Sequence, residues 1–158
     1  KHWSYGTSGV LADARGQRPF LVIAPVQTDK TKESIVEVQK ELHDIAGARP
    51  IRGEEYASLM RTQTLGLPGR FATLASLETA GIQLVNYRYP DDYFTTYARR
   101  VRTLGEPELA AAAKKFIRPD DVIWIVVGDL AQVEAGLRSL NLGEVMRVDG
   151  DGRTVGAR

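Results

Sequence analysis

The run VIWIVV at residues 122–127 limits the possible folds of this chain more than any other stretch. All of its residues are apolar and most are β-branched, which favours a β-strand. The run does not alternate with polar residues, so it predicts a strand that is buried. It is also far too short to cross a bilayer as a helix.

Two more strands are expected at the start of the chain, over residues 3–12 and 18–26. The segment PFLVIAPV within the second is rich in β-branched and aromatic residues. Between the two strands, DARGQR (residues 13–18) supplies Gly16 for a turn. The pattern therefore predicts a β-hairpin.

Helical patterns fill most of the middle of the chain. The clearest is TDKTKESIVEVQKELHDIAG (residues 28–47), whose apolar residues recur at steps of three and four. Further helices are expected over residues 54–65, 70–86, 91–104, 106–117 and 130–140. The order of elements predicts an α+β fold, a two-layer α/β sandwich in which helices cover a mostly antiparallel sheet. We expect one domain over residues 1–150 and a flexible, glycine-rich tail over 151–158.

Composition excludes several classes of function. Lys and Arg number 21 against 20 Asp and Glu, so the net charge of +1 implies no nucleic-acid partner. No cysteine is present, which excludes disulfides, thiolate metal sites and a cysteine nucleophile, and fits a periplasmic protein. Because the chain begins at Lys1 rather than at Met, we expect it to be an excised or processed fragment.

The residues offer no recognisable catalytic site. His2 and His43 are the only histidines, and neither HExxH nor HxxEH occurs, so we expect no zinc bound by this chain. No GxSxG nucleophile motif is present. His43 is interpreted as an exposed helix residue, and the pair Asp120–Asp121 as a cap at the start of an element. The turn IVVGDL lacks the glycines of a phosphate-binding loop.

The aromatic start, KHWSYGTSG, has two interpretations. Tyr5 at a strand end could present its hydroxyl to a peptide carbonyl, because Gly6 and Gly9 allow another backbone to approach closely. Such a sheet edge could accept an extended peptide as an added strand. Alternatively, Trp3 and Tyr5 pack on a helix, which the residues alone favour.

Over nearly its whole length the chain resembles the C-terminal, non-catalytic domain of the insulinase/pitrilysin family of zinc metallopeptidases, and most of all the bacterial, periplasmic "zinc protease" type. The stretches that carry the resemblance are WSYGTSGVLADARGQRPFLVIAPVQTDKTKESIVEVQKEL, LPGRFAT, YPDDYFTTYARRV and AAAKKFIRPDDVIWIVVGDLAQVEAGL. Their order and spacing are more specific than any one of them.

The resemblance implies the non-catalytic half of a zinc-dependent endopeptidase, inactive by itself. Tyr5 matches the family's substrate-binding tyrosine, and with Gly6 it would contact substrate at the wall of the proteolytic chamber, while Trp3 would belong to the core. The zinc and the HxxEH motif would belong to a partner half, on the same chain or in a separate subunit. The family's substrate-binding arginine and the first strand and helix of the domain would precede Lys1.

Two other functions stay open. A member of the same family can be a structural or assembly subunit with no proteolytic role, and a homodimer is possible for either. The hypothesis of a small-ligand-binding α/β domain would be supported by the turn IVVGDL alone. None of these implies a membrane partner or a cofactor bound by this chain.

Overall fold

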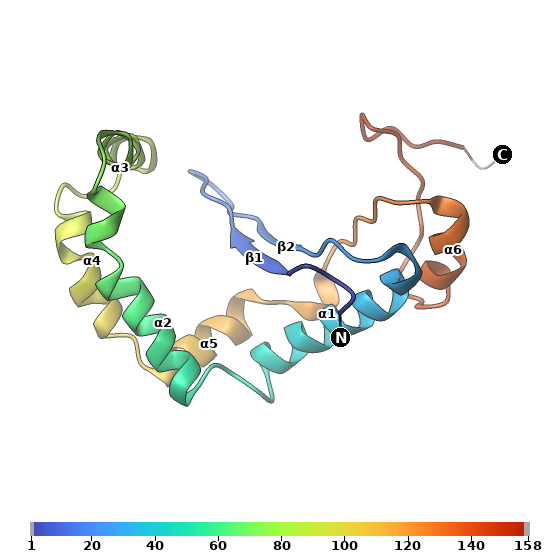
Figure 1. Cartoon of the computed structure of the whole chain (residues 1–158), viewed down its shortest axis with the longest axis horizontal. Helices are drawn as coiled ribbons and strands as arrows, with labels where there is room; N and C mark the ends of the chain where they lie inside the picture. The colour runs from blue at the N-terminus through green and yellow to red at the C-terminus, as the bar shows by residue number, and fades with distance from the viewer. Residues whose placement is uncertain (1, 157–158) are drawn as a thin grey trace. The chain divides into compact units, whose positions relative to one another are not determined.

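A computed structural model describes residues 2–156, and this part of the chain is mostly helical (Figure 1). It contains six α-helices, three short 3₁₀ helices and one two-stranded antiparallel sheet. The expected two-layer α/β sandwich with a mostly antiparallel sheet is therefore wrong. The helical expectations were sound, and the error lies in the sheet.

The helices lie close to where the apolar spacing predicts them. The α-helices are α1 (Thr31–Ala46), α2 (Gly53–Leu65), α3 (Leu74–Tyr87), α4 (Tyr93–Arg102), α5 (Glu106–Phe116) and α6 (Leu130–Arg138). The 3₁₀ helices are η1 (Thr28–Lys30), η2 (Pro68–Phe71) and η3 (Pro119–Asp121). Among the described residues, no helix is both long and apolar enough to span a membrane.

The predicted hairpin forms, with shorter strands than expected. Strands β1 (Ser8–Leu11) and β2 (Phe20–Ile23) pair with each other. The backbone N–H of Ala12 donates to the carbonyl of Pro19 at 3.0 Å and continues the pairing toward the turn. Arg18 and Asp13 then form an ion pair at 2.5 Å across that turn.

The buried strand predicted at residues 122–127 does not form. This segment has no strand partner in the described part of the chain, and Ile123 and Val127 are 89% and 95% exposed. A β-strand is stabilised by hydrogen bonds to a neighbouring backbone, whereas an apolar run favours the strand conformation without supplying that neighbour. The hairpin thus remains the only sheet among the described residues.

The described residues divide into two compact units. The first, called unit 1, comprises residues 1–8, 22–39 and 123–158. In it, Ile35 of α1 and Val133 of α6 are buried, with 7% and 6% of their surface exposed. Glu134 of α6 accepts a hydrogen bond from Arg147 at 2.7 Å, which holds the segment after α6 against the helix.

The C-terminal part of unit 1 contains a short turn. Val148 and Thr154 form an isolated antiparallel bridge, and Asp149 donates its N–H to the carbonyl of Arg153 at 2.9 Å. Gly152 has a φ of 79°, in the left-handed region that glycine tolerates best. Residues 157–158 of the expected flexible tail lie outside the described residues.

The other, called unit 2, comprises residues 9–21 and 40–122. In it α2 and α4 pack against each other, as Figure 1 shows. The Tyr97 hydroxyl on α4 donates to Oε1 of Gln63 on α2 at 2.8 Å. The Tyr56 hydroxyl, also on α2, donates to the carbonyl of Leu104 beyond the end of α4 at 2.9 Å. These two side-chain bonds join the C-terminal end of α2 to the middle of α4, and the N-terminal end of α2 to the segment after α4.

An aromatic cluster links the end of α3 to the start of α4 within unit 2. The rings of Tyr89 and Tyr93 stack with centroids 4.2 Å apart, and Phe94 packs edge-on against Phe71 at 5.3 Å. Such ring contacts add to the gain from burying apolar surface. Burial raises the pKa of the Tyr93 hydroxyl above its usual value, and the neighbouring phenols of Tyr89 and Tyr97 contribute in the same direction.

Candidate functional site

The backbone around Tyr5 is held within unit 1 by pairing on its N-terminal side. Ser4 forms an isolated antiparallel bridge with Val26, and the N–H of Gln27 donates to the carbonyl of Trp3 at 2.9 Å. These contacts continue the course of the hairpin beyond β1 and β2. The position of the Tyr5 backbone is thus fixed by the segment that follows β2.

The Tyr5 side chain itself is completely exposed, at 109% of its reference accessible area. Trp3, two residues earlier, is half-buried. The packing of Tyr5 on a helix, which the residues alone favoured, is therefore not seen. A phenol hydroxyl can both donate and accept a hydrogen bond, so this exposed hydroxyl can bind a carbonyl or an amide.

Gly6, immediately after Tyr5, has a backbone conformation that favours glycine. Its φ is 156°, a conformation that residues with a side chain rarely adopt. Its N–H donates to Ser4 Oγ at 3.1 Å, and the Ser4 hydroxyl donates to the Gly6 carbonyl at 2.8 Å. A Cβ added at Gly6 would meet no atom within 4 Å, so the space beside this backbone is open.

Gly9 differs from Gly6 in its surroundings. A Cβ at Gly9 would lie 3.5 Å from the Phe20 ring, in ordinary van der Waals contact, so the Phe20 ring covers the space beside this glycine. Of the two glycines expected to allow close approach of another backbone, only Gly6 has open space beside it. The candidate site therefore consists of Tyr5 and Gly6, the two residues that the sequence singled out.

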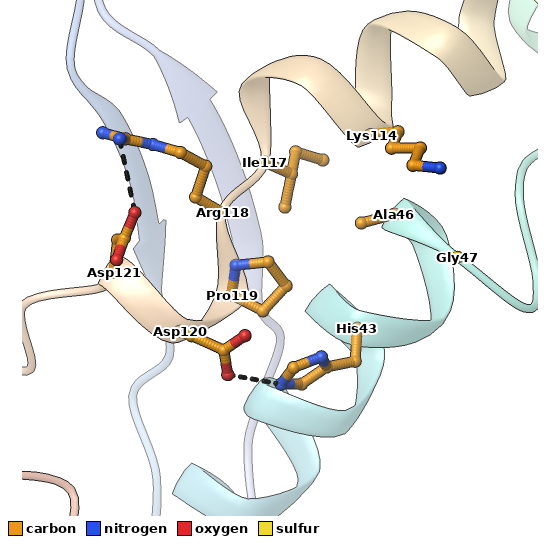
Figure 2. A pocket seen from close by; sticks show the side chains of 9 residues that line it. All are labelled: His43, Ala46, Gly47, Lys114, Ile117, Arg118, Pro119, Asp120 and Asp121. Atoms are coloured by element: carbon orange, nitrogen blue, oxygen red, sulfur yellow. Dashed lines mark ion pairs between the residues drawn. The ribbon is translucent and has the colours of Figure 1, made fainter.

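A second polar site, which the sequence did not reveal, lies within unit 2 (Figure 2). An open pocket of about 430 Å³ lies between the end of α1 and the segment joining α5 to η3. His43 Nε2 lies 3.2 Å from Asp120 Oδ1, and Arg118 Nη1 lies 3.3 Å from Asp121 Oδ2. The Lys114 side chain lines the same pocket.

Sequence reasoning assigned His43 to an exposed helix face and Asp120 and Asp121 to capping. His43 does lie on α1 and is about half exposed. Asp120, however, contacts His43 and Asp121 forms an ion pair with Arg118, and no side-chain cap bond is present at η3. The local sequence holds no signal for the pairing of His43 with Asp120, because it depends on a contact between segments far apart in the chain.

The chemistry available in this pocket is limited. A carboxylate beside an imidazole can orient the ring and stabilise its charged form. The lining residues include no serine, threonine or cysteine that such a pair could activate as a nucleophile. Asp121 already pairs with Arg118, and His43 and Asp120 are too exposed for their contact to be strong.

The described residues contain no group of three His, Cys, Asp or Glu side chains that could hold a metal ion. We assign no metal ligand to this chain. In comparisons with known proteins, no family model matches the sequence and no curated protein is similar to it.

Proposed function

We propose that this chain is the non-catalytic half of a zinc-dependent endopeptidase of the insulinase/pitrilysin family. In this proposal Tyr5 binds the backbone of a peptide substrate, and the chain contributes to the wall of the chamber in which cleavage takes place. The zinc ion and the HxxEH motif belong to a partner half, and the complete protease works in the periplasm.

The observation that supports the proposal is that the Tyr5 side chain is exposed while the backbone before it is held in place. Its side chain is exposed to solvent, while Trp3 and Ser4 before it are tied by backbone contacts to Val26 and Gln27. A large aromatic side chain left in water at a fixed point of the backbone is typical of a binding residue. The open space beside Gly6 leaves room for a peptide at the same point.

The free energy of one hydrogen bond limits how much Tyr5 can contribute to peptide binding. A neutral hydrogen bond is worth about 0.5–1.5 kcal/mol net, so Tyr5 alone cannot hold a peptide tightly. Its role would be to position the substrate backbone beside the partner's catalytic groups. Positioning of this kind acts on the rate because the reacting groups must meet in a narrow range of geometries.

The test is cleavage of a quenched fluorescent peptide by the HxxEH-bearing half from the same organism, with and without this chain. We expect the chain to raise kcat/KM, and Tyr5→Phe to lower it about two- to tenfold, as the loss of one hydrogen bond predicts. Tyr87→Phe is the matched control, since Tyr87 lies in unit 2 and its ring packs against that of Tyr89.

Two results would count against the proposal in different ways. If the chain raises the rate but Tyr5→Phe and Tyr87→Phe behave alike, Tyr5 does not bind substrate. If the chain forms a complex with the HxxEH half and leaves its rate unchanged, the chain has no part in proteolysis.

The second of those results would favour an assembly subunit without proteolytic function. One observation supports this alternative: α3 carries apolar side chains in water, with Leu74 at 86% and Val85 at 73% exposure. Exposed apolar surface of this kind often marks a contact with another protein. Charged replacements at Leu74 and Val85 that abolish complex formation, with Tyr5→Phe silent, would establish it.

A further inference from the structure

Helix α3 of unit 2 has two sides that differ in their exposure to water. The exposed residues along one side, called here the α3 face, are Leu74, Leu77, Glu78, Gly81, Ile82 and Val85. These positions recur at steps of three and four, so they share one side of the helix. The half-buried residues of α3 lie along the opposite side and are Ser76, Ala80, Gln83, Leu84 and Tyr87.

The α3 face is the more apolar of the two sides, although it is the one in water. Leu74 and Val85, near the two ends of α3, are 86% and 73% exposed, and Leu77 and Ile82 between them are about half exposed. The covered side, in contrast, includes a serine and a glutamine. A surface helix of a globular protein buries its apolar stripe. The reversed arrangement in α3 therefore indicates that a partner covers the α3 face.

The geometry of a helix face selects the geometry of its partner. The backbone groups of α3 bond within the helix, so a partner contacts it through side chains. An extended segment laid on this face would bury its own N–H and C=O groups without partners, whereas a second helix has already paired them. The α3 face has four apolar side chains, and a standard protein–protein interface takes about 20–30 residues from each side. The partner that fits this area is therefore a single amphipathic helix.

The only charge on the α3 face belongs to Glu78, which lies near its middle, one turn from both Leu74 and Ile82. Glu78 is exposed, and its carboxylate makes no hydrogen bond or ion pair within the described residues. An apolar partner would take this carboxylate out of water unpaired, which is strongly unfavourable. A lysine or arginine opposite Glu78 gives the carboxylate a charged hydrogen-bond partner instead.

A second copy of this chain does not offer that cation through the same helix. Glu78 is the only charged residue from Leu74 to Tyr87, so two α3 faces packed together would bring two carboxylates and no cation. An anionic membrane surface would repel the same carboxylate. A helix of another protein that carries its own cation is favoured over both.

We propose that the α3 face docks an amphipathic helix of another protein, with a lysine or arginine in the middle of its apolar stripe. The apolar side chains of the α3 face supply the contact area, and Glu78 selects the partner by its charge. The proposal names the kind of partner that the apolar surface of α3 takes in an assembly. It does not rest on a role of Tyr5 in proteolysis.

The probe is a fluorescent peptide of about 18 residues, which is long enough to form a helix. Leucines at steps of three and four form its apolar stripe, a lysine lies in the middle of that stripe, and alanine and glutamine fill the other positions. Fluorescence anisotropy measures its binding to this chain, and methyl NMR identifies the side chains that it contacts. We expect saturable binding, with shifts in the methyl signals of Leu77, Ile82 and Val85.

Exchange of charges tests the role of Glu78. Replacing the lysine of the peptide by glutamate turns an attraction into a repulsion, so binding to the unaltered protein should weaken about three- to tenfold. Glu78→Lys should reverse this preference, so that the glutamate peptide binds more tightly than the lysine peptide. Glutamate and lysine are similar helix formers, so this variant should keep its fold. Glu55→Lys is the matched control, because Glu55 is exposed on α2 and also makes no ion pair within the described residues.

Several results would overturn the proposal. Failure of the lysine peptide to bind, or binding without shifts in these methyl signals, would show that the α3 face does not dock a helix. Equal binding of the two peptides, or the same reversal in Glu55→Lys, would show that Glu78 does not select the partner. Shifts of the same signals as the protein concentration rises, without any peptide, would show that a second copy covers the α3 face. Tyr5→Phe should leave peptide binding unchanged, so failure in the cleavage assay and failure here are separate results.

Discussion

Substitution of Ile35 by alanine should destabilise the protein, whereas the same truncation at the next residue, Val36, should have almost no effect. Both residues lie in α1, but Ile35 is 7% exposed and Val36 is 47% exposed. Successive helix residues point about 100° apart, which explains how neighbours can differ this much. The pair therefore compares a buried and an exposed position at one point of one helix.

The exposures set the size of each effect. Ile35→Ala removes three buried carbon atoms at about 0.8 kcal/mol each and leaves a cavity, so the free energy of unfolding should fall by about 2–4 kcal/mol. Val36→Ala removes two carbon atoms that are about half in water, a loss of about 0.8 kcal/mol. The higher helix propensity of alanine restores about 0.6 kcal/mol of this, so the net change should be within about 0.5 kcal/mol.

Urea unfolding followed by far-ultraviolet circular dichroism measures both variants. With an m-value of about 2 kcal/mol/M, Ile35→Ala should lower the midpoint by about 1–2 M, and Val36→Ala should leave it nearly unchanged. An unchanged m-value is needed for the comparison, because it shows that the same surface is exposed on unfolding. Equal shifts for the two variants would refute the assignment of Ile35 to a core.

Three further predictions concern other parts of the structure. Thr73 caps α3 through a reciprocal capping box, so Thr73→Ala should cost about 1 kcal/mol in urea unfolding. Hydrogen bonds from Arg138 and then Arg147 lower the pKa of Glu134 in the folded protein below its usual value. The ionised Glu134 therefore stabilises the folded protein above its pKa in the unfolded chain, and this stabilisation is lost as the pH falls through its lower pKa in the folded protein. Glu134→Gln should therefore show a smaller decrease of the urea midpoint than the unaltered protein between about pH 6 and about pH 3. Burial raises the pKa of Tyr93, so Tyr93→Phe should remove an ionisation step above the usual tyrosine range in an ultraviolet titration.

The helices could be predicted because their signals are local. The apolar residues of α1 recur at steps of three and four, and Ile35 and Leu42 of that set are buried. The spacing also placed α2, α4 and α5 within a few residues of their observed bounds. A helix completes its backbone hydrogen bonds within one segment, so a short stretch of sequence carries most of the information.

The sheet could be predicted only in part, because its bonds join separate segments. The hairpin of β1 and β2 could be predicted, since its strands are close in sequence and joined by a turn. The run at residues 122–127 has the composition of a strand but no neighbour to pair with in the described structure. For the same reason the pairing of His43 with Asp120 left no trace in the local sequence.

Tyr5 and Gly6 could be named from the sequence because their choice depends on residue type more than on pairing, and their role as a site stays a prediction. Tyr5 and Gly6 were selected for a hydroxyl and for a flexible backbone, and the structure gives Tyr5 full exposure and Gly6 a φ of 156°. Whether the hydroxyl touches a substrate is a separate matter, which the cleavage assay addresses. The resemblance supplied the substrate class, and the comparisons with known proteins add nothing to it.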